Sequence, residues 1–104
     1  MSAVTTHVLD TAAGRPAAGI AVRLEGPAGL LGISVTDDDG RVRSLGPDTL
    51  AAGRYRLVFD TDGYFDGPSF FPEVAVTFTV TEGAEHYHVP ILLSPFAFST
   101  YRGS

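Results

Sequence analysis

Hydrophobic and polar residues alternate along most of this 104-residue chain, with the period of two that is typical of β-strands. Segment 74–81 (VAVTFTVT) has an apolar residue at every second position, and so does most of segment 53–60 (GRYRLVFD). β-Branched and aromatic residues are common in both, as expected for strands with one buried face. Residues that favour turns separate such segments. We therefore predict about eight strands, over 4–9, 20–25, 31–36, 41–45, 53–60, 74–81, 86–93 and 96–102.

Short strands at close spacing predict an all-β fold, a sandwich of two antiparallel sheets. Segment 61–70 is the one candidate for a helix, and Gly63, Gly67 and Pro68 limit it to a single turn. A chain of this length is expected to form one domain, spanning 1–104.

Composition and charge narrow the range of functions. The chain has no Cys, which excludes disulfides, thiolate metal sites and cysteine nucleophiles. The net charge is −5 and the seven basic residues, all Arg, are scattered, so we expect no nucleic-acid partner. No stretch approaches the roughly 20 apolar residues of a membrane span, and no secretory signal is visible. We therefore expect a cytoplasmic protein without membrane contacts, and we interpret the acidic run 37–39 as a solvated turn.

Three histidines are the first candidates for chemistry: His7, His86 and His88. His86 and His88 share one strand face by the period of two. Each could be a hydrogen-bonded structural residue, a metal ligand or an acid–base catalyst, because an imidazole titrates near neutral pH. No acidic residue stands at a supporting spacing, so we predict no metal site.

Three motifs carry a family resemblance: THVLD at 6–10, YHVP at 87–90 and the terminal YRGS at 101–104. With them the chain resembles the 5-hydroxyisourate hydrolases, the transthyretin-related enzymes of urate breakdown, over nearly its whole length. YRGS is the most specific of the three motifs. The resemblance implies a transthyretin-like sandwich, no cofactor and a homotetramer built as a dimer of dimers. The last strands would pair across each dimer, and the active sites would lie in the channel between dimers.

The resemblance also assigns the site. His7 matches the histidine of the first motif, His88 matches that of YHVP, and Arg41 follows the turn at 39–40. These three are the expected catalytic residues. A guanidinium there can donate two parallel hydrogen bonds to a planar, oxygen-rich ring. Arg43 and Arg102 compete for that role, although Arg102 is better explained as an anchor that holds the tail by an ion pair. Substrate binding is expected from His7, Arg41, Tyr101 and Ser104.

The predicted reaction is hydrolysis of 5-hydroxyisourate to 2-oxo-4-hydroxy-4-carboxy-5-ureidoimidazoline in urate (purine) catabolism. Arg41 would orient the substrate, and a neutral imidazole, His7 first and His88 second, would activate water. Ser104 is a poor covalent nucleophile because no neighbouring base or rigid frame supports it. The alternatives are a non-catalytic transthyretin-like carrier of small molecules, which would favour an apolar channel, and an adhesion-type sandwich module.

Overall fold

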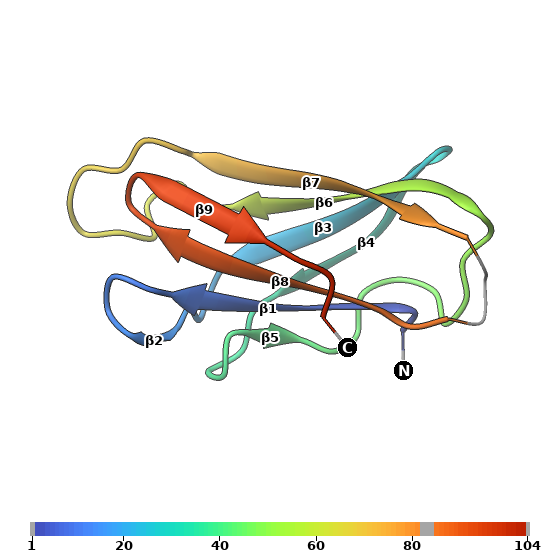
Figure 1. Ribbon diagram of the computed structural model, residues 1–104, viewed down its shortest axis with the longest axis horizontal. Coiled ribbons are helices and arrows are strands. Elements are labelled where there is room, and N and C mark those ends of the chain that lie inside the picture. Colours follow the sequence, from blue (N-terminus) through green and yellow to red (C-terminus); the bar gives the residue numbers. More distant parts are fainter. Residues whose placement is uncertain (1, 82–84, 104) are drawn as a thin grey trace.

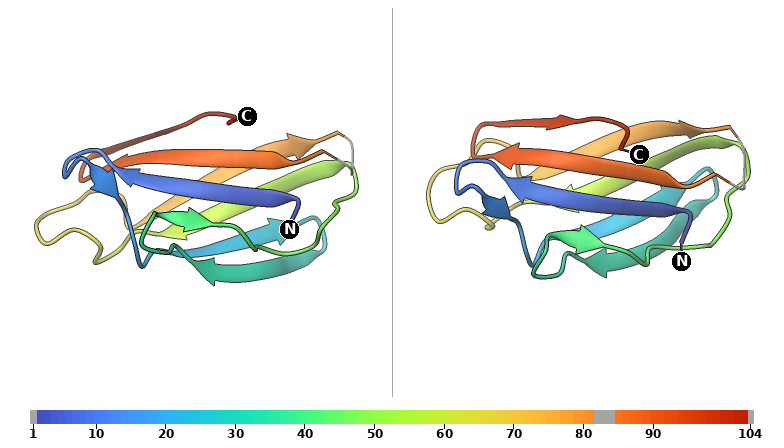
Figure 2. Two further views of the ribbon diagram at one scale, coloured as in Figure 1. Left: turned by 90° about the horizontal axis from the view of Figure 1, so that it is seen from below. Right: turned by 60° about the horizontal axis from the view of Figure 1, so that its bottom comes forward.

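The computed structural model describes residues 2–81 and 85–103, which form two β-sheets packed face to face (Figure 1). Figure 2 shows the sheets as two layers, with β8 and β1 side by side in one of them. One sheet contains β1 (Val4–Asp10), β2 (Arg15–Pro16), β5 (Arg41–Val42), β8 (Tyr87–Ser94) and β9 (Ala97–Thr100). The other contains β3 (Ala21–Gly26), β4 (Gly29–Val35), β6 (Gly53–Asp60) and β7 (Glu73–Val80).

The predicted sandwich of two sheets is confirmed. The second sheet has the order β4-β3-β6-β7 with every neighbour antiparallel. The first has the order β2-β1-β8-β9, and β5 pairs with β1 beside β2. Within it β1 and β8 run parallel, which strand periodicity alone does not reveal. Two strands so far apart in sequence have no hairpin turn to impose an antiparallel direction.

Each of the eight predicted segments contains a strand, and β2 is a short addition at a sheet edge. No helix forms among the described residues. Segment 61–70 holds a turn, in which the amide of Tyr64 donates to the Thr61 carbonyl at 3.2 Å. The limit of one turn predicted for this segment is therefore confirmed. Within the described residues, no helix is long or apolar enough to span a membrane.

The core lies between the sheets and uses alternate residues of each strand. Leu57 and Phe59 of β6 are fully buried, and they belong to one cluster with Val4 and Val8 of β1 and Ile91 of β8. Burying one such side chain stabilises the fold by roughly 1.5–3 kcal/mol. Since Val4 and Val8 face this core, the residues between them that point the other way lie on the outer surface of the sheet.

One buried hydroxyl ties the start of β3 to the end of β4. The amide of Ile20 donates to Thr36 Oγ1 at 2.9 Å, and the hydroxyl of Thr36 donates to the carbonyl of Ala17 at 2.7 Å. Thr36 is 4% exposed, so water is a poor substitute for either partner. Loss of the hydroxyl would leave two buried backbone groups unsatisfied.

Replacing Thr36 by valine keeps the shape of the side chain but removes both hydrogen bonds. We expect Thr36→Val to lower the free energy of unfolding by about 1–3 kcal/mol, measured by urea denaturation. Thr77→Val, on an exposed position of β7, is the matched control and should change stability by about 0.5 kcal/mol or less. Equal losses in the two variants would contradict this account of Thr36.

Candidate functional site

The candidate site lies on the outer face of the first sheet, where β1 runs between β5 and β8. His7 of β1 is paired directly with Arg41 of β5, and Thr5 is paired with His88 of β8. Paired residues in neighbouring strands project to the same face. Three adjacent strands therefore bring together His7, Arg41 and His88, the three expected catalytic residues, on the face opposite the core.

A tight turn before β5 presents Arg41. Asp37 organises it, because its Oδ1 accepts hydrogen bonds from the amides of Asp39 at 2.9 Å and Arg41 at 3.0 Å. The Arg41 amide, followed by the Asp39 amide and the charges of Arg43 and Arg41, lowers the pKa of the Asp37 carboxyl. Gly40 has a φ of +74°, and a Cβ there would collide with the carbonyl oxygen of Val8. The acidic run is exposed, as predicted, and one member orders the turn.

The two arginines of this segment differ in their partners. Arg43 Nη1 lies 3.1 Å from Asp37 Oδ2, so its guanidinium is engaged in the turn. Among the described residues, the guanidinium of Arg41 has no ion pair within 4.0 Å. Arg41 is thus the better placed of the two to meet a ligand, as its position in the motif suggests.

The ring of His7 is oriented by the same turn. Its Nε2 lies 2.9 Å from the carbonyl oxygen of Asp39. A carbonyl can only accept, so Nε2 carries the hydrogen and donates it. In a neutral ring Nδ1 is then the atom able to accept a proton.

The ring of His88 is held from the side of β1. Its Nδ1 lies 2.8 Å from the hydroxyl oxygen of Thr5, and the same oxygen lies 3.0 Å from Nε2 of His86. Burial lowers the pKa of His88, and the positive charge of Arg41 and the nearby rings of His86 and His7 lower it further. His88 is consequently a neutral imidazole at neutral pH, able to accept a proton.

Two pockets adjoin His88. One, of about 230 Å³, opens over β1 and β5, and its lining includes Thr5, Arg41, Arg43, His86 and His88. The other, of about 320 Å³, is more apolar, and its lining includes Phe78, Tyr87, His88, Tyr101 and Arg102. His88 lines both pockets. Because Arg41 lines the first pocket as well, a small planar molecule there would contact both side chains.

The C-terminal tail is fastened beside His88. The amide of Gly103 donates to the His88 carbonyl at 2.9 Å. Arg102 forms an ion pair with Glu85 at 3.2 Å, and its Cζ lies 4.7 Å from the centre of the Tyr87 ring. The prediction that Arg102 anchors the tail by an ion pair is confirmed. Tyr101 lines the apolar pocket and is 57% exposed, whereas Ser104 lies outside the described residues.

Sequence reasoning overlooked Thr5. Its hydroxyl touches two of the three histidines, yet Thr is common in strands and stands in no recognised motif position. The available signal was its place two residues before His7, which puts both on one strand face. Among the described residues, no group of three or more His, Cys, Asp or Glu side chains could hold a metal ion.

Sequence comparisons match this chain to one protein family and to named proteins of urate degradation. A sequence model described as the HIUase/Transthyretin family matches residues 4–103. A mouse protein named 5-hydroxyisourate hydrolase is 46% identical, with 99% of this chain and 96% of the relative covered. An Arabidopsis thaliana protein named uric acid degradation bifunctional protein TTL is 48% identical over 97% of this chain, and the chain spans 37% of its length.

Solved structures agree with the sequence comparison. The structure of Klebsiella pneumoniae 5-hydroxyisourate hydrolase superposes with a TM-score of 0.88 at 36% identity, covering 97% of this chain and 98% of the other. Transthyretin from Sparus aurata also superposes with a TM-score of 0.88, at 29% identity and with 99% and 97% coverage.

The tail leaves no space for a side chain at position 103. A Cβ on Gly103 would lie 2.6 Å from Cδ2 of the His88 ring, closer than such atoms approach. We expect Gly103→Ala to displace the tail or the His88 ring. By NMR, the imidazole signals of His88 should shift, and the amide at position 103 should lose protection from hydrogen exchange.

Gly67→Ala is the matched control, because a Cβ at Gly67 meets nothing within 4 Å. It should leave the His88 signals and the tail amide unchanged. The packing of the tail against His88 would be contradicted if Gly103→Ala behaved like this control.

Proposed function

The chain belongs to the HIUase/transthyretin family, and we propose that it hydrolyses 5-hydroxyisourate, the substrate in the names of its mouse and Klebsiella relatives. The comparisons support an enzyme of the hydrolase class. The observation that carries the proposal is the convergence of His7, Arg41 and His88 on one sheet face beside a pocket of about 230 Å³. A cation and two imidazoles there suit water addition to a carbonyl group.

Arg41 is the proposed electrophilic group. Its guanidinium has no ion pair with the described residues and can donate hydrogen bonds to the carbonyl oxygen under attack. Negative charge develops on that oxygen as water adds, so a fixed cation stabilises the transition state more than the ground state.

His88 is the proposed general base. A general base must be neutral, and burial together with Arg41 keeps the pKa of His88 below the ordinary value. His88 also lines the pocket with Arg41, which favours it over His7, the first choice from sequence. His7 donates from Nε2 to Asp39 and would position the substrate or the water with its other edge.

The proposed reaction adds one water to a ring carbonyl carbon. His88 takes a proton from the water as the new C–O bond forms, and the carbon–nitrogen bond of the ring then breaks. The leaving nitrogen takes up a proton, which the imidazolium can return. The ring opens to a carboxylate and a ureido group, giving 2-oxo-4-hydroxy-4-carboxy-5-ureidoimidazoline.

The tail and the assembly complete the proposal. Tyr101 and Ser104 would contact the substrate from the tail that is fastened beside His88.

We also propose a cytoplasmic homotetramer, a dimer of dimers, as the family resemblance implies. The sheet edges β7 and β9 carry unpaired backbone groups, and every residue of β9 is exposed. Pairing between copies would cover such edges.

A carrier function is the second candidate, because transthyretin from Sparus aurata shares the fold. Its support here is the apolar pocket beside Tyr101. The charged and titratable groups of the other pocket disfavour it, since a cation costs desolvation when an apolar ligand covers it.

The first test is an ultraviolet time course of 5-hydroxyisourate generated in place by urate oxidase. We expect the protein to accelerate decay of the substrate well beyond the spontaneous rate. Arg41→Gln should lower kcat about 10²–10³-fold, as loss of an oxyanion donor does, and His88→Asn about 10²–10⁴-fold. Arg54→Gln, an exposed arginine of β6, is the control and should retain activity.

Decay no faster than the spontaneous reaction, from a folded protein, would favour the carrier. Full activity in both Arg41→Gln and His88→Asn would leave the hydrolase in place but would refute these residue roles.

The pH dependence of kcat/KM provides a second test, because this ratio reports the pKa values of the free enzyme. Only the neutral form of His88 can act as a base, and a lowered pKa extends this form to more acidic pH. Activity should therefore persist as the pH falls past about 6.5, the ordinary value for histidine, and decline only at lower pH. An acidic limb at or above that value would contradict the assignment of His88 as the base.

A further inference from the structure

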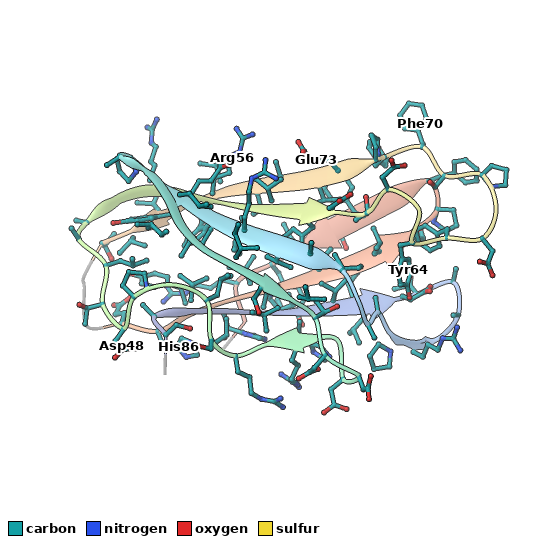
Figure 3. All side chains as sticks on the ribbon, turned by 180° about the vertical axis from the view of Figure 1, so that it is seen from behind. Asp48, Arg56, Tyr64, Phe70, Glu73 and His86 are labelled. Atoms are coloured by element: carbon teal, nitrogen blue, oxygen red, sulfur yellow. The ribbon has the colours of Figure 1, made fainter. Side chains whose placement is uncertain are left out.

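The hydroxyl of Thr5 lies between two histidine rings. Its oxygen is 2.8 Å from Nδ1 of His88 and 3.0 Å from Nε2 of His86. Thr5 is 7% exposed, so these rings rather than bulk water satisfy it. Figure 3 shows His86 at the end of the molecule opposite Tyr64, outside the strands at the entrance to β8.

A hydroxyl has one hydrogen to donate, which couples the two rings. If Thr5 donates to His86, it must accept from His88, and Nδ1 of His88 then carries the hydrogen. If Thr5 donates to His88 instead, Nε2 of that neutral ring carries the hydrogen. The two arrangements place the basic lone pair of His88 on different atoms, so they differ in catalytic consequence.

The base role proposed for His88 favours the first arrangement. The Thr5 hydroxyl occupies Nδ1 of His88, so Nε2 is the nitrogen left to take a proton from water. In a neutral ring Nε2 can accept a proton only when the hydrogen is on Nδ1, and Nδ1–H then donates to Thr5.

We propose that Thr5 is a positioning residue, which accepts a hydrogen bond from Nδ1–H of His88 and donates its own hydrogen to Nε2 of His86. The Nε2 atom of His88 is then left with its lone pair, in the form that a general base requires. A hydrogen bond to one nitrogen commonly selects the tautomer of a functional histidine in this way. This inference rests on the proposed hydrolase function, but the tautomer can be measured without any activity.

The tautomers can be read by ¹⁵N NMR of the imidazoles, at about two pH units above the ordinary histidine pKa of about 6.5. We expect Nδ1–H in His88 and in His86, and Nε2–H in His7, which donates to Asp39. His7 therefore serves as an internal reference within one spectrum. In Thr5→Val, which keeps the shape without the hydroxyl, His88 should lose its preference for Nδ1–H.

Kinetics test the consequence. Thr5→Val should lower kcat about 10- to 100-fold, the usual effect of removing such a partner, with little change in KM. Thr5→Ser retains the hydroxyl and should restore both kcat and the His88 tautomer. Thr61→Val is the matched control, because it removes a buried hydroxyl hydrogen bond, to the Phe71 carbonyl, far from the histidines. It should affect stability but not kcat.

The outcomes separate the two proposals. A His88 ring with its hydrogen on Nε2 in the unchanged protein would overturn the role of Thr5, whatever the activity. An unchanged kcat in Thr5→Val, in a protein that hydrolyses the substrate, would overturn it as well. A protein with the expected tautomers but no hydrolysis would refute the proposed function alone.

Discussion

The parallel ladder between β1 and β8 is the constraint on which both the core and the site depend. It pairs seven residues of β1 with seven of β8, from Val4 with Tyr87 to Asp10 with Leu93. Val4 and Val8 enter the core on one face, and Thr5 and His88 meet on the other. A slip of one residue would turn every β1 side chain over. Packing of the core therefore fixes the register that brings Thr5 to His88.

Two local structures, the turn before β5 and the C-terminal tail, position the site residues that the β1–β8 ladder does not hold. The turn ordered by Asp37 delivers Arg41 opposite His7, and the same turn offers the Asp39 carbonyl to the His7 ring. On the other side, Arg102 and Gly103 fasten the tail to residues at the start of β8. Both structures use hydrogen bonds and exposed ion pairs, which orient side chains although each adds little stability.

The sequence predicted the fold well because alternation reports directly on one-sided burial. The strands around Leu57 and Val76 illustrate this, since their apolar faces turn inward as expected. The motifs located His7, Arg41 and His88, and the structure brings them to one face. The parallel direction of β1 and β8, and the bridging position of Thr5, could not be predicted from the sequence. Both depend on contacts between residues about 80 positions apart, which no local pattern encodes.

Arg41 has two electrostatic effects at this site that cannot be separated by removing it. Its charge can stabilise a developing oxyanion, and it also helps to keep the pKa of His88 low. A substitution of Arg41 that removes the charge therefore weakens the electrophile and makes the base easier to protonate. The effects of changing Arg41 and His88 should not add, because each alters the electrostatic setting of the other. The rings of His7 and His86 also lower the pKa of His88. Several residues of this sheet face therefore set the protonation state of His88 together.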